Sequence, residues 1–169
     1  MQYKTLYEKS ANFYRKRPLA LKALIACNYF LTGTFFAAYG ALIIYAFVNA
    51  LGVWDLCGIF AVPAFCLVFI SVLRKCIARP RPYSEKGANI QPLIIKNSKN
   101  SCSFPSRHLA SAYVIAMVVL FHFTPAGICL LSLGLLLGYV RFALGLHYPS
   151  DLFGGAIFGA LCGLLFLLF

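Results

Sequence analysis

Long apolar runs constrain this chain more than any other feature of its sequence. They cover residues 19–50, 56–73, 108–123, 128–140 and 152–169. A helix needs about 20 residues to cross the hydrocarbon core of a bilayer, and the fourth run reaches that length by continuing through Leu146. Hydrophobic residues make up 62% of the chain and charged residues 11%, whereas soluble domains are about half apolar and a quarter charged. We therefore predict an all-α fold, a polytopic transmembrane helical bundle of about five spans.

The first 18 residues are of a different kind. The stretch "MQYKTLYEKSANFYRKR" is basic and aromatic, and it lacks the apolar core of a signal peptide. Such a composition is typical of a short amphipathic helix lying on an anionic membrane surface. We therefore expect a basic N-terminal segment, residues 1–18, followed by a single transmembrane domain, residues 19–169.

The connections between the runs bring three motifs to one end of the predicted bundle. Residues 50–55 and 124–127 are expected to be short turns, and residues 79–107 to be one long polar loop. Counting the spans along the chain then places three segments on the same side of the membrane. They are "RKCIARPRP" (74–82), "PSRH" (105–108) and "VRFALGLHYPSD" (140–151).

The chain carries a net charge of +11, from fifteen Lys and Arg against four acidic residues. In a membrane protein such an excess follows from the positive-inside rule or from attraction to phosphate-bearing partners. A two-metal phosphatase site needs several carboxylates to hold its ions, and four acidic residues are too few to make one readily. We expect no metal and no other cofactor, and we expect the partners to be lipids and not nucleic acid.

The three motifs carry side chains suited to phosphoryl transfer. His147 and Asp151 are four residues apart, close enough for the carboxylate to hold one ring nitrogen while the other attacks phosphorus. His108, at the start of a span, is placed to protonate a leaving oxygen, and nearby arginines neutralise the transferring group. Simpler explanations exist: arginines flank spans, Ser106 caps a helix, and Asp151 suits a helix dipole. His122, at the far end of its run, is assigned no role.

In order and spacing the motifs resemble those of the type 2 phosphatidic acid phosphatases, which are related to the vanadium haloperoxidases. That family carries K-x6-R-P, P-S-G-H and S-R-x5-H-x3-D, and the resemblance covers residues 56–169. It implies that His147 is the nucleophile and forms a phosphohistidine, that Asp151 orients it, and that His108 acts first as acid and then as base. The substrate ligands that it implies are Arg81, Ser106 and Arg141, with Arg74 or Lys75, and we add Arg107 as a candidate from the second motif. Residues 79–107 would then be the active-site loop of the phosphatase domain.

Three positions depart from the family pattern. Arg74 stands where the pattern has lysine and is in register with Arg81, whereas Lys75 is one residue out, so the sequence leaves open which of the two reaches the site. Arg107 replaces a glycine, and its side chain either adds a phosphate contact or narrows the entrance. Val140 replaces a serine and removes one hydroxyl. None of these changes touches the histidines or the aspartate, so we expect activity with an altered substrate preference.

The sequence therefore predicts a metal-independent membrane phosphatase that acts on the terminal phosphate of a lipid phosphate or diphosphate. Phosphatidic acid, phosphatidylglycerol phosphate and a polyprenyl diphosphate all fit, and the oligomeric state stays open. The alternative is a non-catalytic membrane protein that binds anionic lipid headgroups. A vanadate-dependent oxidase is disfavoured because such relatives are soluble and this chain is too apolar.

The distribution of charge also bears on the side that the site faces. With five spans, all fifteen Lys and Arg fall on the side of the motifs, and none lies in the turns at 50–55 or 124–127. The positive-inside rule favours the cytosol for that side. A cytosolic site favours phosphatidic acid or phosphatidylglycerol phosphate over a polyprenyl diphosphate recycled outside. Many bacterial members of the resembled family face outward instead, with six spans.

Overall fold

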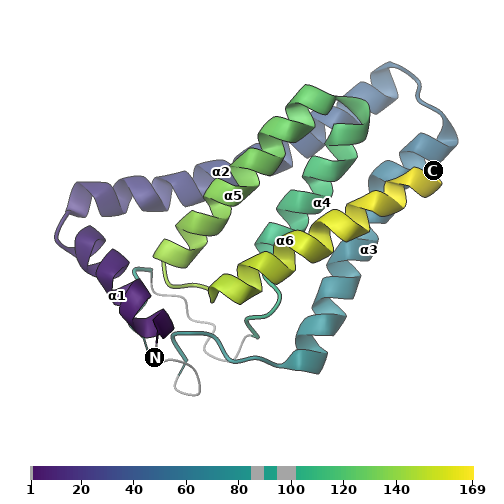
Figure 1. Cartoon of the computed structure of the whole chain (residues 1–169). Coiled ribbons are helices and arrows are strands. Elements are labelled where there is room, and N and C mark those ends of the chain that lie inside the picture. Colours follow the sequence, from purple (N-terminus) through teal and green to yellow (C-terminus); the bar gives the residue numbers. More distant parts are fainter. Residues whose placement is uncertain (1, 85–89, 95–101) are drawn as a thin grey trace.

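The computed structural model describes residues 2–84, 90–94 and 102–169, and in this part of the chain all regular structure is helical (Figure 1). The helices, in chain order, are α1 (Gln2–Arg15), α2 (Pro18–Val48), α3 (Val53–Ile77), α4 (Arg107–His122), α5 (Thr124–Ala143) and α6 (Pro149–Leu164), followed by a short 3-10 helix, η1 (Leu165–Leu168). The prediction of an all-α bundle is confirmed.

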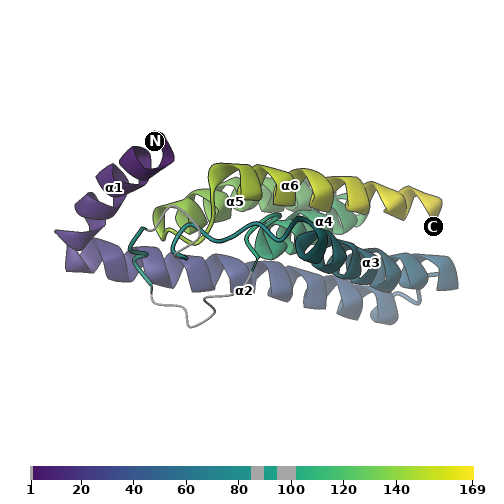
Figure 2. The ribbon, with the colours of Figure 1, turned by 90° about the horizontal axis from the view of Figure 1, so that it is seen from below.

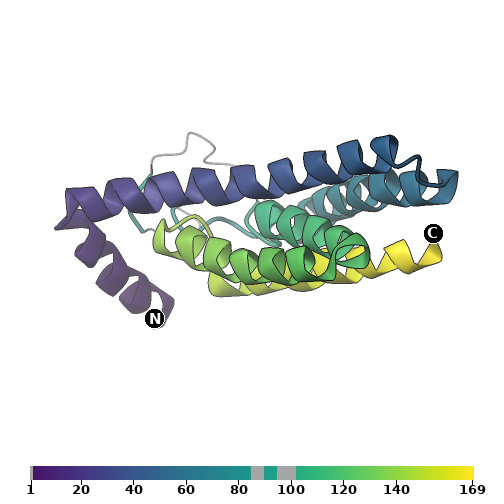
Figure 3. The same ribbon diagram turned by 90° about the horizontal axis from the view of Figure 1, so that it is seen from above.

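Helix α4 lies at the centre of the bundle. It contacts α2, α3, α5 and α6, and two opposite views show it between α2 on one side and α5 and α6 on the other (Figures 2 and 3). Most of its buried side chains are small or β-branched, namely Ala110, Ala112, Val114, Ile115, Ala116, Val118 and Val119. Small side chains let neighbouring helices approach closely, which is how helices pack within a bilayer.

Four of the described helices are long and apolar enough to cross a membrane. They are α2, α3, α5, and α6 continued by η1. Helix α4, predicted as a further span over residues 108–123, has 16 residues and is shorter than the others. Because the other helices surround α4, protein and not lipid buries much of its backbone.

Prolines begin three of the helices, and the one in α5, Pro125, corrects the predicted turn at residues 124–127. Pro18, Pro125 and Pro149 occupy the first turns of α2, α5 and α6, where the fixed φ of proline is already helical and its missing N–H costs nothing. Residues 124–127, predicted to be a turn, therefore form the first turn of α5, and the chain reverses at Phe123 alone. The turn predicted at 50–55 is also shorter, because α3 begins at Val53.

The glycines of α6 set its distance from α4. Gly155, Gly159 and Gly163 recur at four-residue spacing and all face α4. A Cβ atom added at Gly159 would lie 2.4 Å from the carbonyl oxygen of Ala110, and one at Gly155 would lie 2.6 Å from that of Ser106. The backbones of the two helices are thus in direct contact, and this contact fixes where α4 begins relative to α6.

Helix α1 packs against the end of the bundle where the polar segments lie (Figure 1). The side chain of Tyr7 is fully buried and its hydroxyl donates to the carbonyl oxygen of Gln91 at 2.7 Å. Its ring covers Gly145, a residue with a left-handed φ of 75° at which an added Cβ would lie 2.8 Å from that ring. The helix predicted in residues 1–18 therefore exists. Its contact with an anionic membrane surface, and the division at residue 18, stay predictions.

The packing of α6 on α4 predicts a difference between two matched glycine substitutions. Gly159→Ala forces the helices apart and is expected to destabilise the fold by about 1–3 kcal/mol. Gly33→Ala, in α2 where nothing lies within 4 Å of the added Cβ, is expected to be neutral or slightly stabilising, because alanine favours helix. Thermal unfolding of both variants in detergent measures the difference. Equal midpoints would contradict the close contact.

Candidate active site

Three polar segments meet at one end of the bundle, which we call the mouth. It is formed by residues 78–82 after α3, residues 102–108 at the start of α4, and residues 144–151 between α5 and α6. Backbone hydrogen bonds tie the segments together: the N–H of Ser103 donates to Arg79 at 2.8 Å, and that of Ser106 donates to Asp151 at 2.9 Å. The convergence predicted from counting spans is confirmed. The described parts of the predicted polar loop contain no helix before Arg107.

His147 is buried in the connection between α5 and α6. Its Nδ1 atom lies 3.1 Å from the carbonyl oxygen of Ser103 and 3.6 Å from Oδ2 of Asp151. A carbonyl oxygen only accepts hydrogen bonds, so Nδ1 is the atom that carries the proton in this contact. The neutral ring then has its lone pair on Nε2. The spacing of His147 and Asp151 predicted that the carboxylate holds the ring, whereas the nearer partner of Nδ1 is the main-chain carbonyl of Ser103.

Asp151 is fully buried and joins all three segments of the mouth. Its Oδ1 accepts a hydrogen bond from Nη1 of Arg79 at 2.8 Å. Its Oδ2 accepts from the hydroxyl of Ser103 at 2.6 Å and from the N–H of Tyr148 at 2.9 Å. A buried carboxylate is stable when it is paired and hydrogen-bonded in this way. Asp151 therefore stays ionised at the start of α6 and 3.6 Å from the imidazole.

Arg79 and Ser103 were not selected as site residues from the sequence. Arg79 looked like one of several cations flanking a span, although its guanidinium also stacks on the ring of Tyr148 at 4.2 Å and donates to Ser150. Ser103 precedes the second motif by two residues and is fully buried. One signal in the sequence could have pointed to Arg79. Acidic residues are scarce, and a buried Asp151 needs a cationic partner, which an arginine of the first motif could supply.

Arg81, Ser106 and Arg141 were predicted to bind phosphate, and all three are buried at the mouth. Each has a buried polar atom with no hydrogen-bond partner among the described residues: Nε of both arginines and Oγ of the serine. Ser106 occupies the N-cap position of α4, yet its hydroxyl makes no capping bond. Native proteins rarely leave buried polar atoms unpaired, so these three atoms favour a polar ligand over the helix-cap explanation.

The structure separates Arg74 from Lys75, which the sequence left as alternatives. Arg74 is buried, and its guanidinium donates to the main-chain carbonyls of Cys102, Ser103 and Pro105. Lys75, the next residue of α3, is exposed. Arg74 is therefore the residue that turns into the mouth, where it holds the segment that carries Ser103 and Ser106.

His108 and Arg107 begin α4 and are both exposed. Their side chains line a cavity of about 220 Å³. Neither His147 nor any of the buried arginines (Arg74, Arg81 and Arg141) lines this cavity. His108 follows the buried Ser106 by two residues and lines the cavity, so the first turn of α4 connects the phosphate-binding candidates to the cavity.

The electrostatics of the mouth keep His147 neutral. Burial lowers the pKa of its imidazole to about 4, and the charges of Arg81 and Arg141 act in the same direction, while the hydrogen bond and charge of Asp151 oppose them. At physiological pH the ring is therefore uncharged, which leaves the Nε2 lone pair free for attack on an electrophile.

A comparison with models of protein families identifies the family of this helical bundle. The model of the PAP2 superfamily matches residues 52–169, which contain all three segments of the mouth. The chain belongs to the PAP2 superfamily. With its four long apolar helices, it is an integral membrane protein.

Two curated relatives carry related sequences. The undecaprenyl-diphosphatase BcrC of Bacillus subtilis (strain 168) is 34% identical over 90 residues, which are 53% of this chain and 45% of that protein. A lipid A 4'-phosphatase of Bacteroides thetaiotaomicron is 34% identical over 100 residues, 57% of this chain and 44% of that protein. The matched segments span less than half the length of either relative.

Two crystal structures share the fold of this PAP2 protein. One, of Aquifex aeolicus LpxE, has a TM-score of 0.73 and 24% identity, covering 98% of this chain and 94% of the other. The second is of a transmembrane PAP2 type phosphatidylglycerolphosphate phosphatase from Bacillus subtilis, with a TM-score of 0.70, 21% identity, and coverage of 98% and 83%.

The contacts of Asp151 predict that Ser103→Ala destabilises the protein by about 1–3 kcal/mol, since it removes a buried hydrogen bond to a charged group. Ser150→Ala is the matched control, because that hydroxyl is exposed and contacts the same network only through Arg79. Unfolding in detergent at neutral pH measures both. A Ser103 variant no less stable than the Ser150 variant would contradict the arrangement.

The lowered pKa of His147 predicts its titration directly. Because the protonated ring is disfavoured, its ¹⁵N resonances are expected to stay those of neutral imidazole from pH 8 to below pH 5.5, with a midpoint near 4. Activity that needs the neutral ring should then persist below the ordinary histidine range and fall only as pH drops toward 4. NMR of ¹⁵N-histidine-labelled protein, with His147→Gln to assign the signals, makes the test. A midpoint near 6.5 would show that the ring is not buried as described.

Proposed function

We propose that this PAP2 protein is a membrane phosphatase that hydrolyses the terminal phosphate of a lipid phosphate or lipid diphosphate through a phosphohistidine at His147. The observation that carries the proposal is the group of three unpaired buried atoms on Arg81, Ser106 and Arg141. Two forked cations and a hydroxyl match the oxygens of a phosphate group. The names of the two relatives, one a diphosphatase and one a lipid phosphatase, support the same class of reaction.

In the first step, the Nε2 lone pair of His147 attacks phosphorus while the bond from phosphorus to the lipid oxygen breaks. His108 donates a proton to that oxygen, so the lipid leaves as a neutral hydroxyl or a protonated phosphate. Arg81 and Arg141 neutralise the transferring group, which is the main requirement in phosphoryl transfer. Asp151 and the carbonyl of Ser103 keep the proton on Nδ1, so that Nε2 is the nucleophilic atom.

In the second step, His108 takes a proton from water, and the resulting hydroxide attacks the phosphorus of the phosphohistidine. The bond between phosphorus and nitrogen breaks, inorganic phosphate leaves, and His147 returns to its neutral form. Lipid tails stay in the bilayer throughout, because the mouth lies at one end of the spanning helices (Figure 1).

Substitution of His147 tests the proposal against the alternative of a non-catalytic lipid-binding protein. His147→Ala is expected to reduce phosphate release from phosphatidic acid, phosphatidylglycerol phosphate and farnesyl diphosphate to background, because it removes the nucleophile. His122→Ala is the matched control, since His122 lies at the opposite end of α4. Wild-type release is measured by phosphate colorimetry in detergent. If the wild type binds these lipids but releases no phosphate, the protein is the non-catalytic lipid-binding alternative and the proposal is wrong.

The same assay tests whether a metal is needed. No three His, Cys, Asp or Glu side chains among residues 2–84, 90–94 and 102–169 are grouped to hold a metal ion, and arginines supply the neutralising charge. Release is expected to continue unchanged in excess EDTA. Activity that collapses with EDTA and returns with Mg²⁺ would exclude this mechanism.

We further propose that the mouth faces the cytosol. Twelve of the fifteen Lys and Arg belong to the described residues, and all twelve lie in α1 or at the mouth ends of α2 to α5; Lys86, Lys96 and Lys99 lie outside them. The proposed chemistry accounts for a few of these charges, and the positive-inside rule for the rest. A cytosolic mouth would have access to phosphatidic acid and phosphatidylglycerol phosphate, whereas the preference among lipids is set by the site itself.

Labelling of single cysteines shows directly which side of the membrane the mouth faces. In a background without the seven native cysteines, Lys16→Cys marks the mouth end and Asn49→Cys marks the opposite end, and both positions are exposed. In intact cells an impermeant maleimide is expected to label Cys at 49 but to label Cys at 16 only after lysis. The reverse pattern would place the mouth outside.

A further inference from the structure

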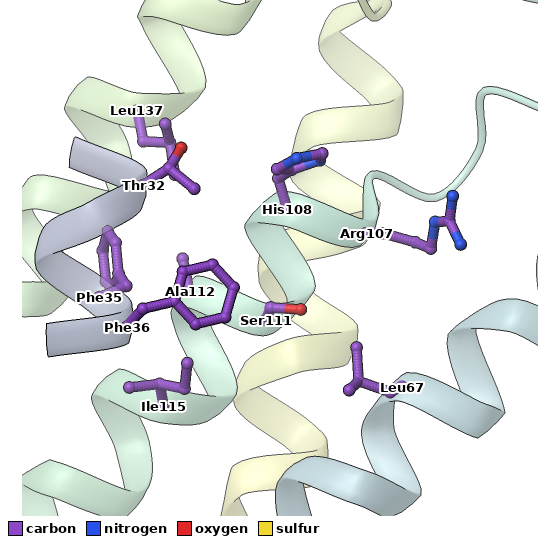
Figure 4. Close-up of a pocket in the computed structure, with 10 residues that line it drawn as sticks. All are labelled: Thr32, Phe35, Phe36, Leu67, Arg107, His108, Ser111, Ala112, Ile115 and Leu137. Carbon is purple, nitrogen blue, oxygen red and sulfur yellow. The ribbon is translucent and has the colours of Figure 1, made fainter. Parts of the chain in front are cut away.

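The cavity beside His108 is lined by two kinds of side chain, polar and apolar (Figure 4). Arg107, His108 and Ser111 of α4 supply polar groups to it, and Thr32 of α2 lies across from them beside Leu137 and Phe35. The remaining lining side chains are apolar and come from α2, α3, α4 and α5: Phe35, Phe36, Leu67, Ala112, Ile115 and Leu137. A charged group bonded to a hydrocarbon chain fits such a cavity, with its charge at Arg107 and its chain against the phenylalanines.

The cavity is distinct from the group of buried residues that would hold the transferring phosphate. Arg81, Arg141 and His147 do not line it, whereas His108 does. If the transferred phosphorus lies with the buried residues, the oxygen that His108 protonates lies at the inner limit of the cavity. Whatever is bonded to that oxygen therefore lies in the cavity, which Arg107 also lines.

The guanidinium of Arg107 has no anionic partner among the described residues. Its side chain is exposed, and the described residues offer it no hydrogen bond or ion pair. The carboxylate of Asp151 is already bonded to Arg79, Ser103 and Tyr148. In this motif the resembled family has glycine, so the charge at position 107 is a property of this chain and not a requirement of the reaction.

We propose that Arg107 binds the second phosphate of a lipid diphosphate, the one that stays on the lipid, and so makes this enzyme prefer diphosphates over monophosphates. In a diphosphate the leaving oxygen is bonded to another phosphorus, which places two or more anionic oxygens beside Arg107. In a monophosphate the same oxygen is bonded to carbon, and Arg107 gains no partner there. The inference rests on the proposed function and deepens it.

The step balances as a phosphoryl transfer. The bond from Nε2 of His147 to the terminal phosphorus forms as the bond from that phosphorus to the bridging oxygen breaks, and the bridging electrons go to the leaving lipid phosphate. Arg107 stabilises the charge that develops there, and His108 supplies the proton. Water then releases inorganic phosphate from His147, so the products are a lipid monophosphate and inorganic phosphate.

Substrate preference in detergent micelles tests the inference, because micelles remove any effect of membrane side. The probes are farnesyl diphosphate and farnesyl monophosphate, which share one tail. We expect kcat/KM of the wild type to favour the diphosphate at least tenfold. In Arg107→Gly, which restores the family pattern, that ratio is expected to fall by about tenfold to a hundredfold, the effect of losing one charge-assisted contact. Arg107→Lys keeps the charge without the fork and should retain part of the preference.

Lys16→Gln is the matched control for a general loss of positive charge at the mouth end, since Lys16 is exposed in the turn after α1 and outside the site. It is expected to leave the ratio unchanged. A wild-type ratio near one, or a ratio that Arg107→Gly does not lower, would overturn the inference while phosphate release still supports the proposed function. Release from neither probe, nor from phosphatidic acid or phosphatidylglycerol phosphate, would overturn both.

Discussion

The buried carboxylate of Asp151 is the interaction on which the mouth depends. Its bonds reach Arg79 after α3, Ser103 before α4 and the backbone of Tyr148 before α6. These residues are separated by up to 72 positions along the chain. An ionised group can be buried only when its lone pairs are satisfied, so the three segments hold one another in place. His147 lies within this arrangement and takes its orientation from it.

Around that carboxylate the mouth gathers more positive charge than its described residues pair. Arg74 and Arg79 donate hydrogen bonds to the protein itself. Arg74 donates to main-chain carbonyls within residues 102–105, and Arg79 donates to the carboxylate of Asp151. Arg81 and Arg141 keep buried donors without partners in the described part of the chain. The cations thus fall into two groups, one that builds the mouth and one that is suited to an anion. Preformed donors need little reorganisation when charge develops in a transition state.

The packing of α4 connects this chemistry to the membrane-spanning fold. Glycines of α6 bring its backbone into contact with the backbone of α4 at Ser106 and Ala110. This contact fixes the first turn of α4, in which Ser106 is buried while Arg107 and His108 line the cavity. Interhelical distance within the bilayer therefore sets the position of groups at its surface, and a bulkier residue in α6 would move them.

The sequence by itself determined the class of fold, the end of the bundle where the motifs meet, and the family. The apolar runs and their number suffice for the first two, because each run must cross the bilayer, and the three motifs indicate the family. It also indicated most of the buried polar residues of the mouth. It did not find that Pro125 makes residues 124–127 helical, nor that Arg74 holds the backbone while Lys75 faces outward. It missed Arg79 and the carbonyl of Ser103, the nearest partner of His147. Only the tertiary structure decided these points, because hydrogen bonds between residues 29 to 72 positions apart depend on helix packing and not on local pattern.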